Sequence, residues 1–262
     1  MFFKSIYMAK QYKLGLALSG GAARGFAHLG VVKALYERGI RPDCISGTSI
    51  GAITGALLAD GHDPEELLGI FTEKRLFSYL GISFKKIGLF KMSGLPDALE
   101  KHLKAKTFED LEIPLYVTCT NLNSGKVEYF NKGALIEKVV ASASIPGLFA
   151  PAKIDGMLYA DGGILDNLPV TPLINKCKKI IGVHVNPTGP EDHIESAISI
   201  VERAFHLSIG ARISEIAKEC DLLIEPDKLQ NYRLMDISAG KVMFDIGYAH
   251  ARKMLEESKI FK

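Results

Sequence analysis

Short apolar runs alternate with longer stretches of helical periodicity along the chain, and turn residues separate the two kinds of segment. This order predicts repeated strand–helix units and therefore an α/β fold with a mainly parallel central sheet. A first buried strand is expected at Leu14–Leu18 and a first helix at Phe26–Glu37. A second strand at Asp43–Ser46 leads into a helix at Ile50–Ala59, whose small residues allow close approach to the sheet.

The remaining chain continues the alternation, with two turns that are typical of hairpins, Asn123-Ser124-Gly125 and Asp155-Gly156. We therefore expect some antiparallel pairs beside the parallel strands. Further strands are predicted at Pro114–Thr120, Lys126–Phe130, Met157–Ala160, Lys179–Val185 and Asp221–Ile224, and further helices at Ala134–Ala143, Glu195–Ala217 and Gly247–Glu257. Without an internal repeat or a low-complexity linker, residues 1–262 are predicted to form a single domain.

Composition and charge narrow the function classes. A net charge of +2 on 262 residues gives no overall field for nucleic acid, so no nucleic-acid partner is expected. The longest apolar stretch, Leu14–Leu35, is interrupted by Arg24, His28 and Lys33, which argues against a membrane-spanning segment. Four cysteines lie far apart without a C-x-x-C pair, so we expect reduced thiols, no zinc site and a cytoplasmic protein.

Residues 74–106 differ from the rest of the chain because they carry eight Lys and Arg against two acidic residues, a net charge of +6. Apolar side chains such as Phe77, Leu80 and Phe90 lie between these cations. This mixture is typical of a lid over a lipid site or of a segment in peripheral contact with an anionic membrane surface. The alternative is a solvated insertion that its lysines keep soluble.

The first candidate for catalysis is Gly47-Thr48-Ser49-Ile50-Gly51, a G-x-S-x-G sequence between a predicted strand and a predicted helix. A serine nucleophile at this place needs a sharp, strained turn, and flanking glycines remove the Cβ atoms that would clash there. The amino-terminal end of the following helix favours negative charge beside Ser49. The alternative is a serine that merely caps this helix.

The second candidate is the glycine-rich loop Ser19–Gly25, which follows the first predicted strand. A P-loop requires Lys and a hydroxyl residue where Phe26 and Ala27 stand, and a dinucleotide fingerprint requires Gly where Ala22 stands. An oxyanion hole made of backbone amides remains, with Arg24 either bracing the loop or adding positive potential. The residues assigned to this hole are Gly20, Gly21, Ala22 and Arg24.

The third candidate is Asp161-Gly162-Gly163 at the end of a predicted hairpin strand. An aspartate has a reference pKa of about 3.9, so Asp161 can act as a base only if it is buried and hydrogen-bonded directly to the serine. An aspartate that binds its own turn amides is the structural alternative. A Ser-His-Asp triad with His250 or His206 is the chemical alternative, although neither histidine lies in a recognisable motif.

These three motifs, in this order, resemble those of the patatin-like phospholipase family. The resemblance covers Leu14–Leu58 and Tyr159–Val170, and extends more weakly to Asp245–Tyr248. It implies a three-layer sandwich and a Ser–Asp dyad with Ser49 as nucleophile and Asp161 as base. It also implies hydrolysis of lipid carboxylic esters, of the phospholipase A or lysophospholipase type, without a metal or an organic cofactor.

One residue departs from the family pattern, because Ala22 stands where the third glycine of the loop is expected. If this position requires a positive φ, alanine adds strain of roughly 1 kcal/mol or weakens one oxyanion donor. This departure keeps open a second function class, a catalytically weak or inactive lipid-binding regulator at the membrane.

Overall fold

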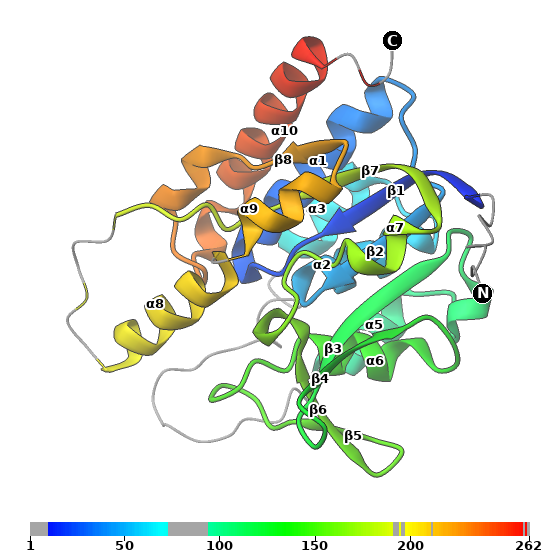
Figure 1. The fold of residues 1–262 in the computed structure, drawn as a ribbon, viewed down its shortest axis with the longest axis vertical. Helices are drawn as coiled ribbons and strands as arrows, with labels where there is room; N and C mark the ends of the chain where they lie inside the picture. The colour runs from blue at the N-terminus through cyan, green and yellow to red at the C-terminus, as the bar shows by residue number, and fades with distance from the viewer. Residues whose placement is uncertain are drawn as a thin grey trace, which may run out of the picture.

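The computed structural model describes residues 10–72, 94–190, 194, 197–210, 212–258 and 260. One mixed sheet of eight strands runs through the middle of this part of the chain (Figure 1). Each strand in the following series is hydrogen-bonded to the next: β5 (Ala152–Ile154), β6 (Met157–Asp161), β3 (Leu115–Asn121), β2 (Cys44–Thr48), β1 (Tyr12–Leu18), β7 (Cys177–Val183) and β8 (Leu222–Ile224), and β4 (Lys126–Phe130) also pairs with β3.

The strands β3, β2, β1, β7 and β8 are parallel neighbours, whereas β4, β5 and β6 form antiparallel pairs. The predicted α/β class and the mainly parallel sheet are confirmed, and so are the antiparallel pairs at one side. The strand β2 runs two residues further than expected, to Thr48. Its hydroxyl residues are compatible with a buried strand because Ser46 and Thr48 donate hydrogen bonds to the carbonyls of Pro169 and Asp166.

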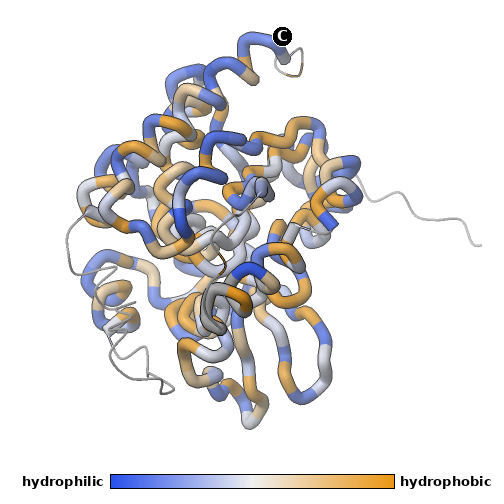
Figure 2. The backbone as a smooth tube through the Cα atoms, turned by 90° about the vertical axis from the view of Figure 1, so that its left-hand side faces the viewer, coloured by the Kyte–Doolittle hydropathy of each residue, from blue (hydrophilic) through white to orange (hydrophobic). Residues whose placement is uncertain are grey.

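Helices cover both faces of the sheet, which gives the three layers that the resemblance implied. Apolar side chains of β1 pack on one face against the larger helical layer and on the other against a thinner one. In Figure 2, hydrophobic and hydrophilic stretches alternate along the helices, as expected for helices with one buried face. The larger layer contains α1 (Phe26–Glu37), α2 (Ile50–Ala59), α6 (Leu135–Ser142) and α10 (Gly240–Glu257), and the thinner one contains α7 (Thr171–Ile174) and α9 (Ile213–Ile216).

Two helix predictions were wrong in their bounds. The last helix, α10, begins at Gly240 rather than at Gly247, because Gly247 lies where α10 crosses α1 rather than at a helix end. A Cβ on Gly247 would lie 2.3 Å from the carbonyl oxygen of Ala27, so glycine is needed for this close crossing. The single helix expected over Glu195–Ala217 is instead α8 (Ala197–Gly210) followed by the separate short helix α9.

Three further α-helices were not predicted: α3 (Pro64–Thr72), α5 (Gly94–His102) and the short α7. The helix α5 belongs to the basic segment 74–106, of which residues 74–93 lie outside the described residues. Its Leu95 and Leu99 are buried, and the amides of Lys104 and Ala105 donate to the Asp60 carboxylate at 2.7 and 3.0 Å. The described end of the basic segment is therefore anchored on the body of the protein, and its role as a lid stays a prediction.

Within the described ranges, no helix is both long enough and apolar enough to cross a lipid bilayer. The described helices pack around the sheet instead, and the longest of them, α10, packs along α1. Contact of residues 74–106 with a membrane surface remains a prediction.

Candidate active site

Ser49 lies at the apex of a sharp turn between β2 and α2. Its backbone has φ 55° and ψ −122°, an unusual conformation for a residue with a side chain, and only 6% of its surface is exposed. The flanking glycines are required by the main chain: a Cβ on Gly51 would lie 2.3 Å from the Leu18 carbonyl oxygen, and one on Gly47 would lie 2.3 Å from the Gly51 carbonyl oxygen. The strained strand-to-helix turn expected from the sequence is confirmed.

The backbone amide of Ser49 is held from the neighbouring helix α6. It donates to Ser142 Oγ at 2.9 Å, and the Ser142 hydroxyl in turn donates to the Thr118 carbonyl at 2.7 Å. This connection fixes the turn against β3 and uses the Ser49 N–H group, so that group is not available to a ligand. Sequence reasoning missed Ser142, since nothing in the local pattern distinguishes it from any other serine near a helix end.

The sheet places Asp161 beside Ser49. In β2, Thr48 pairs with Thr118 of β3, and in β6, Asp161 pairs with the next residue, Cys119. The strand β4 pairs along one edge of β3. Both β2 and β6 therefore pair along the opposite edge of β3, with β6 following where β2 ends. The residue after the end of β2 and the residue at the end of β6 are thereby brought together.

Asp161 has the properties that a carboxylate base needs. It is 2% exposed, and burial raises its pKa from an ordinary 3.8 to about 6. Two hydrogen bonds oppose this rise in the pKa, one from the Ser49 side chain and one from the Gly163 amide to Asp161 Oδ1 at 2.7 Å. The carboxylate is thus mainly ionised at neutral pH, bonded to the serine hydroxyl, and far more basic than an exposed aspartate.

The glycine-rich loop follows β1 and faces the Ser49 turn. Ala22 adopts φ 47°, so the position does require the positive φ that was considered from the sequence. The Gly20 amide donates to the Asn167 carbonyl at 3.1 Å. Among the described residues, by contrast, the amides of Gly21 and Ala22 meet no acceptor, which leaves these two free to bind an anion.

Arg24 is built into the protein rather than exposed at a surface. It is 4% exposed, and its Nε and Nη2 atoms donate to the Tyr232 carbonyl at 2.9 and 2.6 Å. Its Nη1 atom lies 3.2 Å from His206 Nε2. Burial, and then the charge of Arg24, lower the pKa of His206 to about 4, so the neutral ring can accept this bond. These contacts fit the bracing alternative for Arg24.

The histidines considered for a triad have partners of their own. His206 contacts Arg24, and His250 Nδ1 lies 3.9 Å from the exposed carboxylate of Asp227. His28, close to the glycine-rich loop, has its Nε2 atom 2.8 Å from the Ser19 carbonyl, and burial lowers its pKa to about 4. These contacts are all with groups other than the Ser49 hydroxyl, and the second ring nitrogen of His28, Nδ1, has no hydrogen-bond partner among the described residues.

Two asparagines were given no role from the sequence, although both connect to the glycine-rich loop. Asn167 accepts the Gly20 amide through its main chain, and Asn186 Nδ2 donates to the Gly20 carbonyl at 2.6 Å. Asn167 lies within a motif that the resemblance covers, which is a signal that could have drawn attention to it. Asn186 follows β7 without any local motif, and only the assembled sheet shows its contact.

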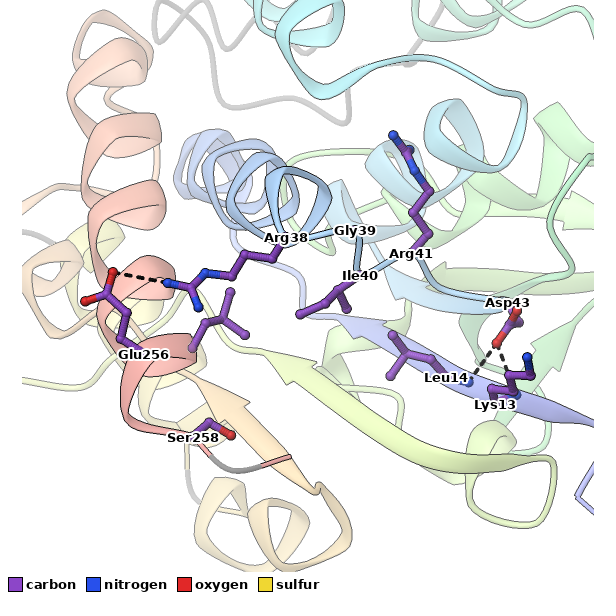
Figure 3. A pocket seen from close by; sticks show the side chains of 10 residues that line it. Lys13, Leu14, Arg38, Gly39, Ile40, Arg41, Asp43, Glu256 and Ser258 are labelled. Carbon is purple, nitrogen blue, oxygen red and sulfur yellow. Dashed lines mark hydrogen bonds and ion pairs between the residues drawn. The ribbon is translucent and has the colours of Figure 1, made fainter. Parts of the chain in front are cut away.

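A cavity of about 780 Å³ lies at the opposite end of the sheet from Ser49 (Figure 3). Leu14, at the start of β1, and Asp43, just before β2, contribute to its lining. Two of the charged side chains there have partners: Arg38 binds Glu256 at 3.1 Å, and the Asp43 carboxylate accepts the Leu14 backbone amide at 2.8 Å. This cavity is not part of the candidate site.

In the part of the chain that the structure describes, no three or more His, Cys, Asp and Glu side chains form a group suited to a metal ion. The buried carboxylate of Asp161 is bonded to a hydroxyl and to an amide. The expectation that the site uses neither a metal nor a cofactor stays a prediction.

Comparison with known proteins gives consistent similarities. A family model described as patatin-like phospholipase matches residues 16–174. An uncharacterized NTE family protein of Mycobacterium bovis is 38% identical over 163 residues, which cover 62% of this chain and 45% of that protein. Lysophospholipase NTE1 of Kluyveromyces lactis is 26% identical over 277 residues, 93% of this chain and 19% of that protein. The chain thus corresponds to less than half of the length of either relative.

Solved structures with the same fold include VipD from Legionella pneumophila, with a TM-score of 0.56 and 18% identity over 95% of this chain and 67% of that one. The ExoU–SpcU complex of Pseudomonas aeruginosa gives a TM-score of 0.50 and 19% identity, over 95% of this chain and 52% of the matched chain. At such low identity, the likeness establishes the fold and nothing further.

Proposed function

Because the chain belongs to the patatin-like phospholipase family, we propose that it is a serine acyl hydrolase that cleaves lipid carboxylic esters with a Ser49–Asp161 dyad. The observation that carries this proposal is the hydrogen bond between the side chains of Ser49, at its strained turn, and Asp161, whose burial raises its pKa to about 6. A carboxylate with this pKa can accept a proton from a serine that it already contacts.

The proposed reaction has two acyl-transfer steps. Asp161 takes the hydroxyl proton as Ser49 Oγ attacks the ester carbonyl, and it returns that proton to the leaving alcohol, which produces an acyl-enzyme. Water then attacks the acyl-enzyme, with Asp161 again accepting and returning a proton, and releases the fatty acid. The oxyanion of each step is stabilised by the amides of Gly21 and Ala22 and by the amino-terminal end of α2.

The substrate class is proposed from the relatives. Lysophospholipase NTE1 of Kluyveromyces lactis aligns with 93% of this chain, which supports a phospholipid or lysophospholipid substrate. The net charge of +6 on residues 74–106 supports peripheral contact with an anionic membrane surface.

A fluorophosphonate probe tests the nucleophile directly. We expect a single labelled residue, Ser49, and no labelling of Ser49→Ala. With lysophosphatidylcholine as substrate, Ser49→Ala and Asp161→Asn should release no fatty acid above background, whereas His250→Ala should remain within tenfold of the wild type. The reverse result for Asp161 and His250 would exclude the dyad.

The fatty-acid release assay, combined with liposome binding, separates an enzyme from a catalytically weak or inactive lipid-binding regulator. The regulator is tested because Ala22 adopts a positive φ in the loop proposed to stabilise the oxyanion. Binding to anionic liposomes is measured beside fatty-acid release, for the wild type and for Ser49→Ala. Equal binding by both proteins with release by the wild type alone supports the enzyme. Binding without release by either protein supports the regulator.

A further inference from the structure

Asn167 lies between the two turns of the site with an unused hydrogen-bond donor. Its side chain is 6% exposed, and its Nδ2 atom has no hydrogen-bond partner within the described part of the chain. An unsatisfied buried amide destabilises a protein by about 1–3 kcal/mol, so such a group calls for an explanation, of which a role toward a ligand is one.

The neighbouring glycines indicate which way this amide points. Asn167 Oδ1 lies 2.5 Å from the place that a Cβ would take on Gly20 and 3.0 Å from the corresponding place on Gly163. In a glycine, a Cα hydrogen points toward the position that a Cβ would take. The Asn167 side-chain oxygen therefore faces one Cα–H group of Gly20 and one of Gly163, which are weak hydrogen-bond donors. The Nδ2 atom, on the other side of the same carbon, faces away from them.

Ser49 is in the same small space. A Cβ added to Gly20 would lie 3.3 Å from Ser49 Cβ and 3.6 Å from Asn167 Cγ. The side chains of Ser49 and Asn167 therefore both lie next to Gly20. The main chain of Asn167 also holds the loop, because its carbonyl accepts the Gly20 amide at 3.1 Å. Asn167 thus occupies the Gly20 amide with its backbone, and its side-chain carboxamide lies in the same small space as the Ser49 side chain.

We propose that Asn167 Nδ2 donates a hydrogen bond to the ester carbonyl oxygen as it becomes an oxyanion, as a third donor beside the amides of Gly21 and Ala22. This role rests on the proposed function. Removal of one oxyanion donor from a serine hydrolase lowers kcat by about 10²–10³-fold. The role also accounts for the glycines at positions 20 and 163, since a Cβ at either would displace the Asn167 side chain.

Asn167→Asp tests the role, because aspartate has nearly the same shape and replaces the donor with an acceptor. With p-nitrophenyl butyrate as substrate, we expect kcat to fall about 10²–10³-fold while KM stays within threefold. The buried carboxylate of the aspartate should lower Tm, so Tm is judged in Asn167→Ala, where it should be close to that of the wild type. The rate of Ser49 phosphonylation by a fluorophosphonate should fall with kcat, since its phosphoryl oxygen needs the same donors. Asn175→Asp, an exposed asparagine at the end of α7, is the matched control and should behave as the wild type.

Asn167→Ala is measured beside Asn167→Asp and decides the question if the buried charge of the aspartate prevents folding. A wild-type kcat in either folded variant overturns the role. In Asn167→Ala, a decrease in kcat with a parallel rise in KM and fall in Tm also overturns it, since that pattern indicates a structural asparagine. If the wild type shows no Ser49-dependent hydrolysis, the proposed function fails and this role with it, and that outcome is seen before any Asn167 variant is measured.

Discussion

The Ser49 turn and the glycine-rich loop follow neighbouring parallel strands, and each holds a non-glycine residue at positive φ, Ser49 at 55° and Ala22 at 47°. They are held in place differently. Around Ser49 the tight contacts are between main chains, as between Gly51 and the Leu18 carbonyl. Around the loop, the atoms that a Cβ on a glycine would meet belong to side chains, as with Asn167 at Gly20 and Val185 at Gly21.

This difference indicates how each turn tolerates substitution. A main chain packed against another main chain cannot move without shifting a strand or a helix, whereas a side chain can change its rotamer. We therefore expect the Ser49 turn to be intolerant of any added atom and the loop to accept small changes. The chain differs from the family pattern at one position of this loop, where Ala22 replaces a glycine, and this difference agrees with the expected tolerance of the loop.

Gly51→Ala should have the largest effect. The added methyl group would lie 2.3 Å from the Leu18 carbonyl oxygen and 2.6 Å from that of Ser19, so α2 must move away from β1. We expect the free energy of unfolding to fall by about 3 kcal/mol and ester hydrolysis to fall at least 100-fold. Chemical denaturation and a kcat measurement provide the two values.

Gly69→Ala is the control for this substitution, because Gly69 lies within the helix α3 and a Cβ there would meet nothing within 4 Å. It should stabilise the protein by about 0.5–1 kcal/mol through helix propensity and leave activity unchanged. Equal effects of Gly51→Ala and Gly69→Ala would contradict the rigid contact at the Ser49 turn.

Asp161→Asn should stabilise the protein while it abolishes activity. Burial raises the pKa of Asp161 to about 6 from 3.8, so ionisation of this group opposes folding as the pH rises through this range. Below about pH 4 the wild type and the variant should unfold at similar temperatures. At pH 8 the variant should be more stable by about 3 kcal/mol, which thermal unfolding across this pH range will show.

The same pKa predicts the pH dependence of the wild-type reaction. The base must be ionised, so kcat/KM should rise with pH and reach half its plateau value near pH 6. A half-point near pH 4 would mean that the Asp161 carboxylate is solvated during catalysis.

Arg24→Lys distinguishes a brace from a source of positive potential. Lysine keeps the charge but cannot donate twice to the Tyr232 carbonyl, as Arg24 does at 2.9 and 2.6 Å. We expect a loss of about 1.5 kcal/mol in stability and about tenfold in kcat. Wild-type activity in Arg24→Lys together with loss of activity in Arg24→Gln would show instead that the charge matters.

Local sequence was sufficient to predict the turn at Ser49 and the glycine-rich loop after the first strand. Both depend on the order of strand, glycine-containing turn and helix, which a short window contains. The approach of Asp161 to Ser49 depends on β2 and β6 sharing one edge of β3, a pairing between distant segments that no local pattern encodes. The resemblance to a known family identified this pair where physical reasoning from the sequence left a histidine triad open.

The contacts of Ser142 and Asn186 that support the site could not be predicted either, because they also join distant segments of the chain. Ser142 and Asn186 lie far along the chain from the residues that they hold, 93 and 166 positions respectively. The early start of α10 was missed because the glycines that allow it to cross α1 look like helix ends in the sequence. In each case the decisive partner belongs to another element.

Ala22→Gly should have the smallest effect and tests whether the departure from the family pattern weakens the loop. Glycine removes the strain of an alanine at φ 47°, but it also increases the conformational freedom of the unfolded chain, so stability should change by no more than about 0.5 kcal/mol. The Ala22 amide already meets no acceptor among the described residues, so kcat should change by less than threefold.

Asp155→Gly, which replaces another residue at positive φ in the exposed hairpin turn, is the matched control for the backbone effect. A tenfold rise in kcat in Ala22→Gly alone would show that alanine weakens an oxyanion donor, and the tolerance inferred for this loop would then apply to folding but not to catalysis.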